Sequence, residues 1–534
     1  MPGEAARAAR YLDSLDPASG EVIGRFEATT PGEVPLVIEH ARRAQQDWAR
    51  RPVGERAARL EHLAKVLYAR RREVAEVVTR ENGKPLAEAL LADVLVSLDS
   101  IRWHARRAPR LLAPERISHH NPAFKSKKSW VEFEPCGVIA VISPWNYPFA
   151  IPLTAVVPAV AAGNAVVVKP SELAPWCGAL LGELFDQADF PIDLVQVIQG
   201  PGELGAALID AGPDKVLFTG SVGTGRRVAE ACARRLIPSV LELGGKDAMI
   251  VLADADVEAA SSAAVWGSLT NCGQACLSVE RIYVEPGVAG RFTELCVEKT
   301  RRLRLGSGLD PNVDVGPMIR KAQIDRVEKQ LKDAVARGAR VLTGGRRRPD
   351  VGPQFFEPAV VTGVGPSMLL MQEETFGPVV AIAAVADAQE AVRLANDSPF
   401  ALGASVWTGD RGRGESLARQ LRSGSVMVND VMSCYGITEA PHGGSGASGW
   451  GRTHSKFGLL EMVQVRYVDI ERFSRWAKPW WFRYDQGLIE LAEGVQEALF
   501  GSGPGARWRG FRKAWREYRA RRRQSANQPR DDRQ

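Results

Sequence analysis

One cysteine of this chain lies in a setting that suits a nucleophile. The segment Asn271–Arg281 surrounds Cys276 with small and amide residues just before an expected strand. A thiolate adds readily to a carbonyl carbon and later departs as a good leaving group. A lone cysteine is also a common small buried hydrophobe, and Cys272 with Cys276 has the spacing of half a metal site. Because no second Cys or His pair at ligand spacing accompanies them, we expect no metal.

Two other segments strengthen the interpretation of Cys276 as a nucleophile. Glu242 opens the sequence Glu-Leu-Gly-Gly-Lys, and Asn146 lies within Pro-Trp-Asn-Tyr-Pro. Together with the cysteine segment they resemble the aldehyde dehydrogenase superfamily. Further matches occur in the family's order and extend the resemblance over roughly residues 12–468: Lys169–Glu172, Phe218–Ser221, Glu374–Pro378 and the glycine-rich stretch Gly443–Arg452.

The resemblance implies roles for three catalytic residues. Cys276 looks like the nucleophile that attacks the aldehyde carbon. The side-chain amide of Asn146 and the backbone N–H of Cys276 match the family's hydrogen-bond donors to the oxyanion. Glu242 matches the base that activates water to hydrolyse the thioester left after hydride transfer, which implies a free carboxylic acid as product.

A second set of residues implies a nicotinamide cofactor. The loop Gly220–Gly225 follows an expected strand and opens a helix, where backbone N–H groups suit a pyrophosphate. Lys169 and Glu172 resemble the pair that holds the adenosine ribose, and because a carboxylate there would repel a 2′-phosphate we expect NAD, with NADP as the alternative. The full expected set is Ser143, Trp145, Lys169, Glu172, Gly220, Ser221, Gly225, Leu243, Glu374 and Phe376.

The aldehyde pocket is expected to be mostly apolar. Its expected lining is Tyr147, Ala150, Leu153 and the loop 432–437, and no arginine stands where it would hold a substrate carboxylate. An aliphatic aldehyde, an aromatic aldehyde and succinic semialdehyde all remain open as substrates. The chain departs from the family at His442, where relatives more often carry an aromatic residue, and at Ser445-Gly446, where they carry a bulkier, basic pair.

Two other classes of function remain open. A cysteine hydrolase or esterase that used Cys276 would need a histidine base, and of the seven histidines only His442 and His454 lie at a glycine-rich loop. A catalytically silent, scaffold-like relative would be expected to lack the nucleophile, the base or the oxyanion donor. None of these three residues is missing.

Bulk composition favours a globular, multidomain protein of a reducing compartment. The 534 residues are 45% hydrophobic and 25% charged, which predicts two to four domains. No run approaches the roughly 18 apolar residues of a membrane span, and seven scattered cysteines do not indicate disulfides, so we expect a cytoplasmic protein. The net charge is +6, but residues 507–523 alone carry nine Arg or Lys against one Glu, so the remainder carries about −2 and no nucleic-acid partner is expected.

The hydrophobic pattern predicts an α/β fold. Residues 31–101 have helical periodicity, and residues 125–142 read as a hairpin and then a strand, with a break at 135–137. Short β-branched runs then alternate with alanine-rich helices, as in a parallel sheet: 138–143, 165–169, 194–198, 215–219 and 248–252. A second alternating block over 282–429 contains expected strands at 281–284, 379–385 and 424–429 and a helix at 321–337.

The resemblance implies an aldehyde dehydrogenase-like architecture of three parts. We expect a Rossmann-like NAD-binding domain over 1–120 and 138–243, and an α/β catalytic domain over 244–440. A small β oligomerisation element is expected from the bridging segments 121–137 and 441–474. A homodimer or homotetramer follows by analogy.

The C-terminal tail, 475–534, lies beyond the resemblance. An aromatic cluster over 476–484 precedes two expected amphipathic helices, and the second carries Trp508, Phe511, Trp515 and Tyr518 amid arginines. Such a helix suits peripheral contact with an anionic membrane surface. An extension that packs on its own oligomer is the alternative, and residues 525–534 are expected to be disordered.

Overall fold

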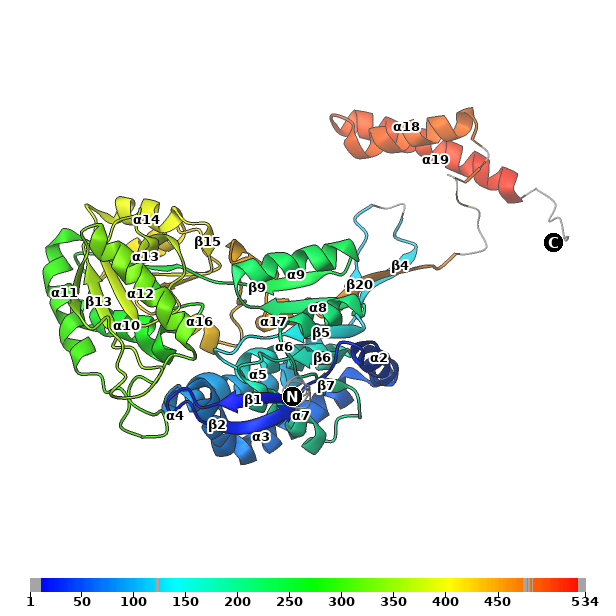
Figure 1. The fold of residues 1–534 in the computed structure, drawn as a ribbon. Coiled ribbons are helices and arrows are strands. Elements are labelled where there is room, and N and C mark those ends of the chain that lie inside the picture. The colour runs from blue at the N-terminus through cyan, green and yellow to red at the C-terminus, as the bar shows by residue number, and fades with distance from the viewer. Residues whose placement is uncertain (1–10, 122–123, 474–477, 479–480, 483, 527–534) are drawn as a thin grey trace. The chain divides into compact units, whose positions relative to one another are not determined.

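The computed structural model describes residues 11–121, 124–473, 478, 481–482 and 484–526 of the chain. Its contacts divide the chain into two compact units. The first contains the chain up to Ala113 together with Phe133–Val465, and the second contains Pro114–Glu132 together with the chain from Arg466 onwards. The first unit holds both large sheets (Figure 1).

The first large sheet has five parallel strands and one short antiparallel strand, in the order β19-β9-β8-β5-β6-β7. The bounds are β5 Val138–Ile142, β6 Ala165–Lys169, β7 Val195–Val197, β8 Lys215–Thr219, β9 Ser239–Glu242 and β19 Gly449–Trp450. β5 and β6 are buried along their whole length, as their unbroken apolar sequences require. The strands expected between residues 138 and 219 are confirmed to within one residue at each end.

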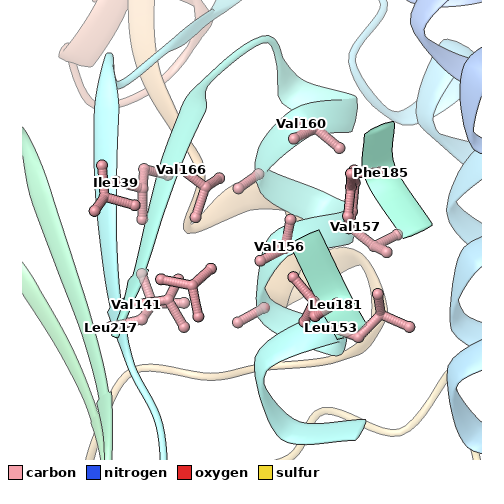
Figure 2. Close-up of a cluster of buried hydrophobic side chains, with 14 of the residues drawn as sticks. Ile139, Val141, Leu153, Val156, Val157, Val160, Val166, Leu181, Phe185 and Leu217 are labelled. Carbon is pink, nitrogen blue, oxygen red and sulfur yellow. The ribbon is translucent and has the colours of Figure 1, made fainter. Parts of the chain in front are cut away.

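Helices from the N-terminal part of the chain and from the crossovers accompany this sheet. They are α2 Val34–Arg50, α3 Val53–Asn82, α4 Leu86–Glu88, a π-helix Ala89–Leu95, α5 Val96–Leu111, α6 Ala150–Ala162, α7 Pro175–Gln187, α8 Gly202–Asp210 and α9 Val222–Arg234. The helical pattern over 31–101 is therefore confirmed. Figure 2 shows how the sheet and α6 share one core, to which each contributes aliphatic side chains: Ile139, Val141, Val166 and Leu217 from the strands, and Leu153, Val156, Val157 and Val160 from α6.

The second large sheet has seven strands in the order β12-β13-β14-β11-β10-β16-β17, and all its neighbours are parallel except β12 and β13. Its bounds are β10 Asp247–Val251, β11 Val279–Val284, β12 Arg340–Thr343, β13 Ala359–Thr362, β14 Val379–Ala384, β16 Gly403–Trp407 and β17 Ser425–Val428. The main helices are α10 Val257–Leu269, α11 Pro286–Arg301, α12 Lys321–Ala336, α14 Ala388–Asn396 and α15 Arg411–Ala418, with α13 Leu369–Gln372 a single turn. Two parallel sheets with helices confirm the α/β class.

The strand expected at 248–252 belongs to this second sheet and not to the first. It is β10, and its neighbours are β11 and β16. The chain leaves the first sheet at Glu242 and enters the second at Asp247 through Leu243–Lys246. Local composition could not reveal this change, because a buried parallel strand has the same apolar sequence in either sheet.

A third, smaller sheet contains β3 Glu115–Ile117, β4 Lys127–Pro135 and β20 Val463–Glu471, in the order β20-β4-β3. The hairpin expected within 125–142 is wrong. β4 is one strand that pairs antiparallel with β3, and the chain continues after it into β5 of the first large sheet. The break comes at Gly137, which has a φ of +130°. A Cβ there would lie 2.2 Å from a carboxylate oxygen of Asp214, so only glycine fits.

Short strands complete the first unit. β1 Tyr11–Leu15 pairs with β2 Val22–Glu27, and β15 Phe400–Ala401 pairs with β18 Ser445–Gly446. β18 and β19 both come from the glycine-rich stretch 443–452, and β19 pairs with β9 beside Glu242. The segment expected to form the bridging element, 441–474, is thus divided between the two units after Val465.

The tail forms a helical hairpin of α18 Gln486–Phe500 and α19 Pro504–Ala526, which confirms the two expected helices. Small residues let the backbones approach closely, since a Cβ on Gly510 would lie 2.3 Å from the Ala498 nitrogen. Lys513 pairs with Glu493 at 2.7 Å and Arg516 with Glu490 at 3.3 Å. In the part of the chain that the structure describes, no helix has the length and apolar character to cross a bilayer. Within the expected aromatic cluster, residues 476, 477, 479, 480 and 483 lie outside the described residues, as do 527–534 of the end expected to be disordered. Residues 525 and 526 are helical instead, because α19 continues through them.

Candidate active site

Cys276 and Glu242 line two neighbouring hollows of the first unit. One is a pocket lined mainly by apolar and aromatic side chains, and the other is a long cleft that runs past the ends of β5, β6, β8 and β9. Six residues line both: Ile151, Phe218, Thr219, Glu242, Leu243 and Cys276. The expected nucleophile and the expected base therefore stand where the pocket meets the cleft.

A tightly constrained loop carries Cys276. It follows a 3-10 turn, Thr270–Gly273, in which Asn271, Cys272 and Gly273 all have φ between +50° and +70°. Such a conformation costs of order 1–3 kcal/mol for a residue other than glycine and occurs mostly at functional sites. Glu88 holds the turn, because its carboxylate accepts hydrogen bonds from the Thr270 hydroxyl at 2.9 Å and the Asn271 N–H at 2.8 Å.

The thiol of Cys276 is desolvated although its residue is partly exposed. Burial, reinforced by the carboxyl groups of Asp247, Glu374 and Glu242, raises the pKa of this thiol far above its usual range. The resting group is therefore a neutral thiol, and attack on a carbonyl requires that a base remove its proton.

Glu242 is a buried carboxyl group at the end of β9. Neither of its oxygens has a hydrogen-bond partner among the described residues. Burial raises the pKa of Glu242 well above its usual range, and the positive charge of Arg452 opposes this shift only in part. A carboxylate with a raised pKa is a stronger base, which suits the removal of a proton from a thiol or from water.

Asn146 is buried on the loop between β5 and α6, with its side-chain nitrogen donating to the Gln274 carbonyl at 3.1 Å. The Asn146 carbonyl accepts from Lys84 Nζ and from Asn271 Nδ2, both at 2.8 Å. Lys84 in turn pairs with Asp93 of the π-helix at 2.8 Å, and both of these side chains are fully buried. The amide is thus tied to the loop that carries Cys276, two residues before that cysteine.

Nine of the ten expected cofactor residues line the cleft: Ser143, Trp145, Lys169, Glu172, Gly220, Ser221, Leu243, Glu374 and Phe376. Ser221 caps α9 and its side chain accepts from the Thr224 N–H. Gly225 is not in the lining. It lies behind it, where a Cβ would come within 2.4 Å of the Leu243 side chain, so this glycine lets α9 pack closely against the cleft wall.

Two of these nine, Glu374 and Phe376, are held by hydrogen bonds and ring contacts of their loop. The backbone N–H groups of Thr375 and Phe376 donate to the carboxylate of Glu280, which also pairs with Lys246 at 2.6 Å. Glu374 accepts from the Gly245 N–H at 3.1 Å, and burial raises its pKa to about 8. The Phe376 ring meets the Trp145 ring edge-on at 5.4 Å between centroids.

A family model for the aldehyde dehydrogenase family matches residues 4–468 of the chain. The chain belongs to this family. A protein of Mycolicibacterium smegmatis described as a candidate succinate-semialdehyde dehydrogenase (NADP+) is 42% identical over 88% of this chain and 90% of its own length. A 4,4′-diapolycopene aldehyde oxidase of a Methylomonas species is 39% identical over 92% and 91% respectively.

Solved structures of aldehyde dehydrogenases share the fold. One from Brucella melitensis biovar abortus has a TM-score of 0.82 and 35% identity, over 86% of this chain and 93% of that one. A betaine aldehyde dehydrogenase from Staphylococcus aureus in complex with NAD+ has a TM-score of 0.84 and 31% identity, over 89% and 94%. This aldehyde dehydrogenase accordingly oxidises an aldehyde with NAD or NADP, and neither the cysteine hydrolase nor the silent scaffold is favoured.

The cleft of this aldehyde dehydrogenase fits a dinucleotide. The Ser143 hydroxyl is buried in the cleft wall and has no hydrogen-bond partner among the described residues. N–H groups at the start of α9 suit a pyrophosphate, and the cleft continues without interruption to Cys276. In the described residues, no cluster of His, Cys, Asp or Glu has an arrangement that could hold a metal ion.

Several residues of the site belong to no recognisable sequence motif. Lys84, Asp93 and Glu280 act through loops that come from distant parts of the sequence. Arg227, Arg320 and Arg326 line the cleft beside the expected cofactor contacts. Arg227 could have been found from its place one turn into α9. Arg320 and Arg326 could not, because only the fold brings the start of α12 to the cleft.

The expected pocket lining is correct for Tyr147 and for the loop 432–437, which contributes Met432 and Tyr435. It is wrong for Leu153, which lies in the hydrophobic core on α6 (Figure 2). Ala150 is buried against Tyr147 and Ala275, behind the lining. The side of α6 that lines the pocket carries Ile151, Thr154 and Ala155, and Leu153 lies on a different side of the helix.

Cofactor choice can be tested at Glu172, whose carboxylate lies 3.7 Å from Lys169 Nζ at the cleft. Replacing Glu172 by Gln removes a charge that repels a 2′-phosphate, and we predict that the ratio of kcat/KM for NADP to kcat/KM for NAD rises about tenfold. Steady-state kinetics with both cofactors measures this ratio. Glu183→Gln, on α7 but outside the cleft lining, is the matched control. An unchanged ratio in Glu172→Gln would contradict the assignment.

Proposed function

We propose that Cys276 is the nucleophile of this aldehyde dehydrogenase, that Asn146 donates to the oxyanion and that Glu242 is the base for hydrolysis. The observation that carries the proposal is that Cys276 and Glu242 line both the pocket and the cleft. An aldehyde in the pocket and a dinucleotide in the cleft would meet at these two side chains.

The first half of the reaction places the aldehyde on Cys276. Sγ forms a bond to the aldehyde carbon as the thiol proton passes to water, so that Glu242 remains ionised for the hydrolytic step. The oxygen that becomes negative accepts hydrogen bonds from the Asn146 amide and the Cys276 N–H. The chemistry that NAD(P)+ supplies when bound is acceptance of the hydride from this carbon. Loss of the hydride leaves a thioester on Cys276.

The second half releases the acid. Glu242 takes a proton from a water molecule, whose oxygen attacks the thioester carbon. The carbon–sulfur bond then breaks, the carboxylic acid leaves and the sulfur of Cys276 regains a proton. The residues that would hold NAD(P) are the cleft residues named above, with Glu374 and Phe376 toward the nicotinamide end and Lys169 and Glu172 toward the adenosine end.

The two catalytic side chains can be separated by kinetics. Cys276→Ala should make no NADH, because no thiohemiacetal can form. Glu242→Gln should make about one NADH per site in a burst and then slow by at least about a hundredfold, because the thioester persists on Cys276. Stopped-flow absorbance and intact-protein mass spectrometry measure both outcomes. Cys272→Ala, a buried neighbour outside the pocket lining, should behave as wild type.

We further propose that the substrate is a neutral, largely apolar aldehyde. Among the described residues, neither Lys nor Arg lines the pocket, whereas Glu242 does. A carboxylate on the substrate would lose its hydration without gaining a cation, which is costly in a buried site. Of the two relatives named above, the one described as acting on a diapolycopene aldehyde fits this pocket better than the one described for succinate semialdehyde.

The charge argument predicts a clear order of substrates. Octanal and benzaldehyde should have kcat/KM values at least about a hundredfold above that of succinic semialdehyde, which corresponds to roughly 3 kcal/mol. NADH formation across the panel checks this order. Methyl 4-oxobutanoate, the neutral ester of succinic semialdehyde, is the matched control and should recover most of the difference. Succinic semialdehyde as the best substrate would overturn the proposal.

We propose that the protein works as a homodimer or homotetramer through β20. This nine-residue strand lies at the edge of its sheet and exposes the side chains of Val465, Tyr467 and Ile470. Edge strands with exposed apolar side chains pair readily with another chain. Sedimentation velocity measures the mass directly, and a monomer that stays monomeric at micromolar concentration would exclude this assembly.

We also propose a cytoplasmic enzyme whose tail contacts the anionic surface of a membrane. All seven cysteines are free, as a reducing compartment requires. On α19, Trp508, Phe511 and Trp515 are 62%, 50% and 51% exposed, and their rings are stacked in a row. These three rings line a shallow hollow of the tail, and Arg512, Arg519 and Arg523 line it with them. Aromatic rings beside arginines suit the interface of an anionic bilayer.

Vesicle flotation tests the tail. The full chain should float with vesicles that contain phosphatidylglycerol and stay in solution with pure phosphatidylcholine, and the double variant Trp508→Ala, Trp515→Ala should lose flotation. Trp450→Ala, an exposed tryptophan of the first unit, is the control and should float as wild type. Equal behaviour with both vesicle types would exclude electrostatic docking.

A further inference from the structure

The pocket contains a cluster of buried polar side chains that the proposed reaction does not use. His442, His454 and Tyr435 all line it together with Glu242. Among the described residues, His442 Nδ1, His454 Nδ1, the Tyr435 hydroxyl and both Glu242 oxygens have no hydrogen-bond partner. Buried polar atoms are nearly always paired in folded proteins, so a cluster of unpaired ones around a base indicates function.

His442 is the member of the cluster that faces the base. Its Nε2 lies 3.8 Å from Glu242 Oε2. The His454 ring lies 5.6 Å from the His442 ring, and the Tyr435 ring meets the His442 ring edge-on at 6.0 Å. His454 and Tyr435 are themselves 5.6 Å apart, so each of the three rings borders the other two. The rings of His454 and Tyr435 therefore pack beside the His442 imidazole.

The backbone of the glycine-rich loop brings His442 close to Glu242. His442 and Thr453 exchange two hydrogen bonds, of 2.9 and 2.8 Å, across the glycine-rich loop. The next residue, Gly443, has a φ of +144°, and a Cβ there would lie 2.8 Å from Glu242 Oε1. His454 has φ 57° and ψ 173°, a region that is essentially restricted to glycine and costs of order 1–3 kcal/mol. Strain of this kind is retained where it orients a functional side chain.

The two histidines of the cluster are uncharged, which suits them to donate a hydrogen bond and not to act as acids. Burial lowers the pKa of His442 to about 4 and that of His454 to about 3, so both rings are neutral near pH 7. A neutral ring has one N–H donor and one acceptor nitrogen. The charged and titratable groups around Glu242 are Arg452, which favours its ionised form, Glu461, which opposes it, and the thiol of Cys276.

We propose that His442 is a positioning residue for the hydrolytic base, whose Nε2–H donates a hydrogen bond to Glu242 when that carboxyl group is ionised. This inference rests on the proposed role of Glu242. The separation of 3.8 Å is longer than a formed hydrogen bond, and apo sites commonly tighten when the reacting state forms. His454 and Tyr435 fix the ring so that little motion is needed. The bond orients the carboxylate and lowers the pH at which it becomes ionised.

Two substitutions at His442 separate hydrogen bonding from packing. His442→Phe keeps an aromatic ring and removes the donor, and His442→Gln keeps a donor. The acyl-enzyme is formed with octanal and NAD, and its decay is followed by rapid quenching and mass spectrometry between pH 5 and 10. His62→Phe, a change at a half-exposed histidine of α3, is the matched control and should leave the profile unchanged.

The proposed hydrogen bond from His442 to Glu242 determines the direction in which the pH profile of the decay rate should shift. Loss of a donor to the ionised form raises the pKa of Glu242, so the acidic limb of the decay rate should move to higher pH in His442→Phe. We expect a shift of about one pH unit, which is about tenfold in rate at neutral pH, with recovery at high pH. The NADH burst should keep an amplitude of one per site. His442→Gln should show less than half of the shift.

Three results would overturn this inference. They are an acidic limb of the decay-rate profile that does not shift in His442→Phe, an equal shift in His442→Phe and His442→Gln, and a loss of decay rate in His442→Phe that persists at every pH. If His442→Phe does not fold, His442→Leu provides the same test. Failure of the proposed function would look different, because Glu242→Gln would then hydrolyse the acyl-enzyme at the wild-type rate. Failure of the inference alone leaves Glu242→Gln stalled and the His442→Phe limb in place.

Discussion

The site depends on two positions where the backbone leaves no room for a side chain. At Gly245 a Cβ would lie 2.3 Å from the carbonyl oxygen of Cys276, and at Gly244 it would lie 2.6 Å from the Glu374 carboxylate. These glycines connect the strand that carries Glu242 to the first strand of the second sheet. Because these two positions are glycines, Glu242, the loop of Cys276 and the side chain of Glu374 converge on one short segment of chain. A side chain at either position would displace the loop of Cys276 or the side chain of Glu374.

Two buried ion pairs hold the remaining parts of the site. Lys84 and Asp93 fix the loop of Asn146, and Asp93 also accepts from the N–H of Ala150 at the start of α6. Lys246 and Glu280 fix the turn before Phe376. Burial of such charges costs about as much as their attraction returns, so these pairs are poor sources of stability. Their value is geometric, since each carries several directed hydrogen bonds to loop backbone. That Asp93 lies in a π-helix accords with the occurrence of such helices at functional sites.

The parts of the fold that are predictable from sequence are those with local causes. Runs such as residues 165–169 specify a buried strand by composition alone, and the loop at Gly220–Gly225 follows such a strand directly. Sheet membership is not local, which is why the sequence pattern groups the strand expected at 248–252 with the strands of the first large sheet and predicts a hairpin where β4 is one strand. In the site, residues within motifs are identifiable, whereas Lys84 and Glu280 are not, because their function lies in contacts made more than 60 residues away. The partnership of His442 with His454 needs the loop geometry for the same reason.

One electrostatic condition links substrate choice to turnover. The lining of the apolar pocket raises the pKa of Glu242 and of Cys276 because it excludes water. None of the described residues of this lining is Lys or Arg. In the proposed reaction, hydrolysis creates a carboxylic acid in this same pocket, beside the carboxyl group of Glu242. Once the product ionises, it faces the same lack of a compensating cation that an acidic substrate would face, so release to water is favoured over retention. A cationic residue in the pocket would hold an acidic substrate better, but it would also hold the acid product, which must leave the pocket before the next aldehyde enters.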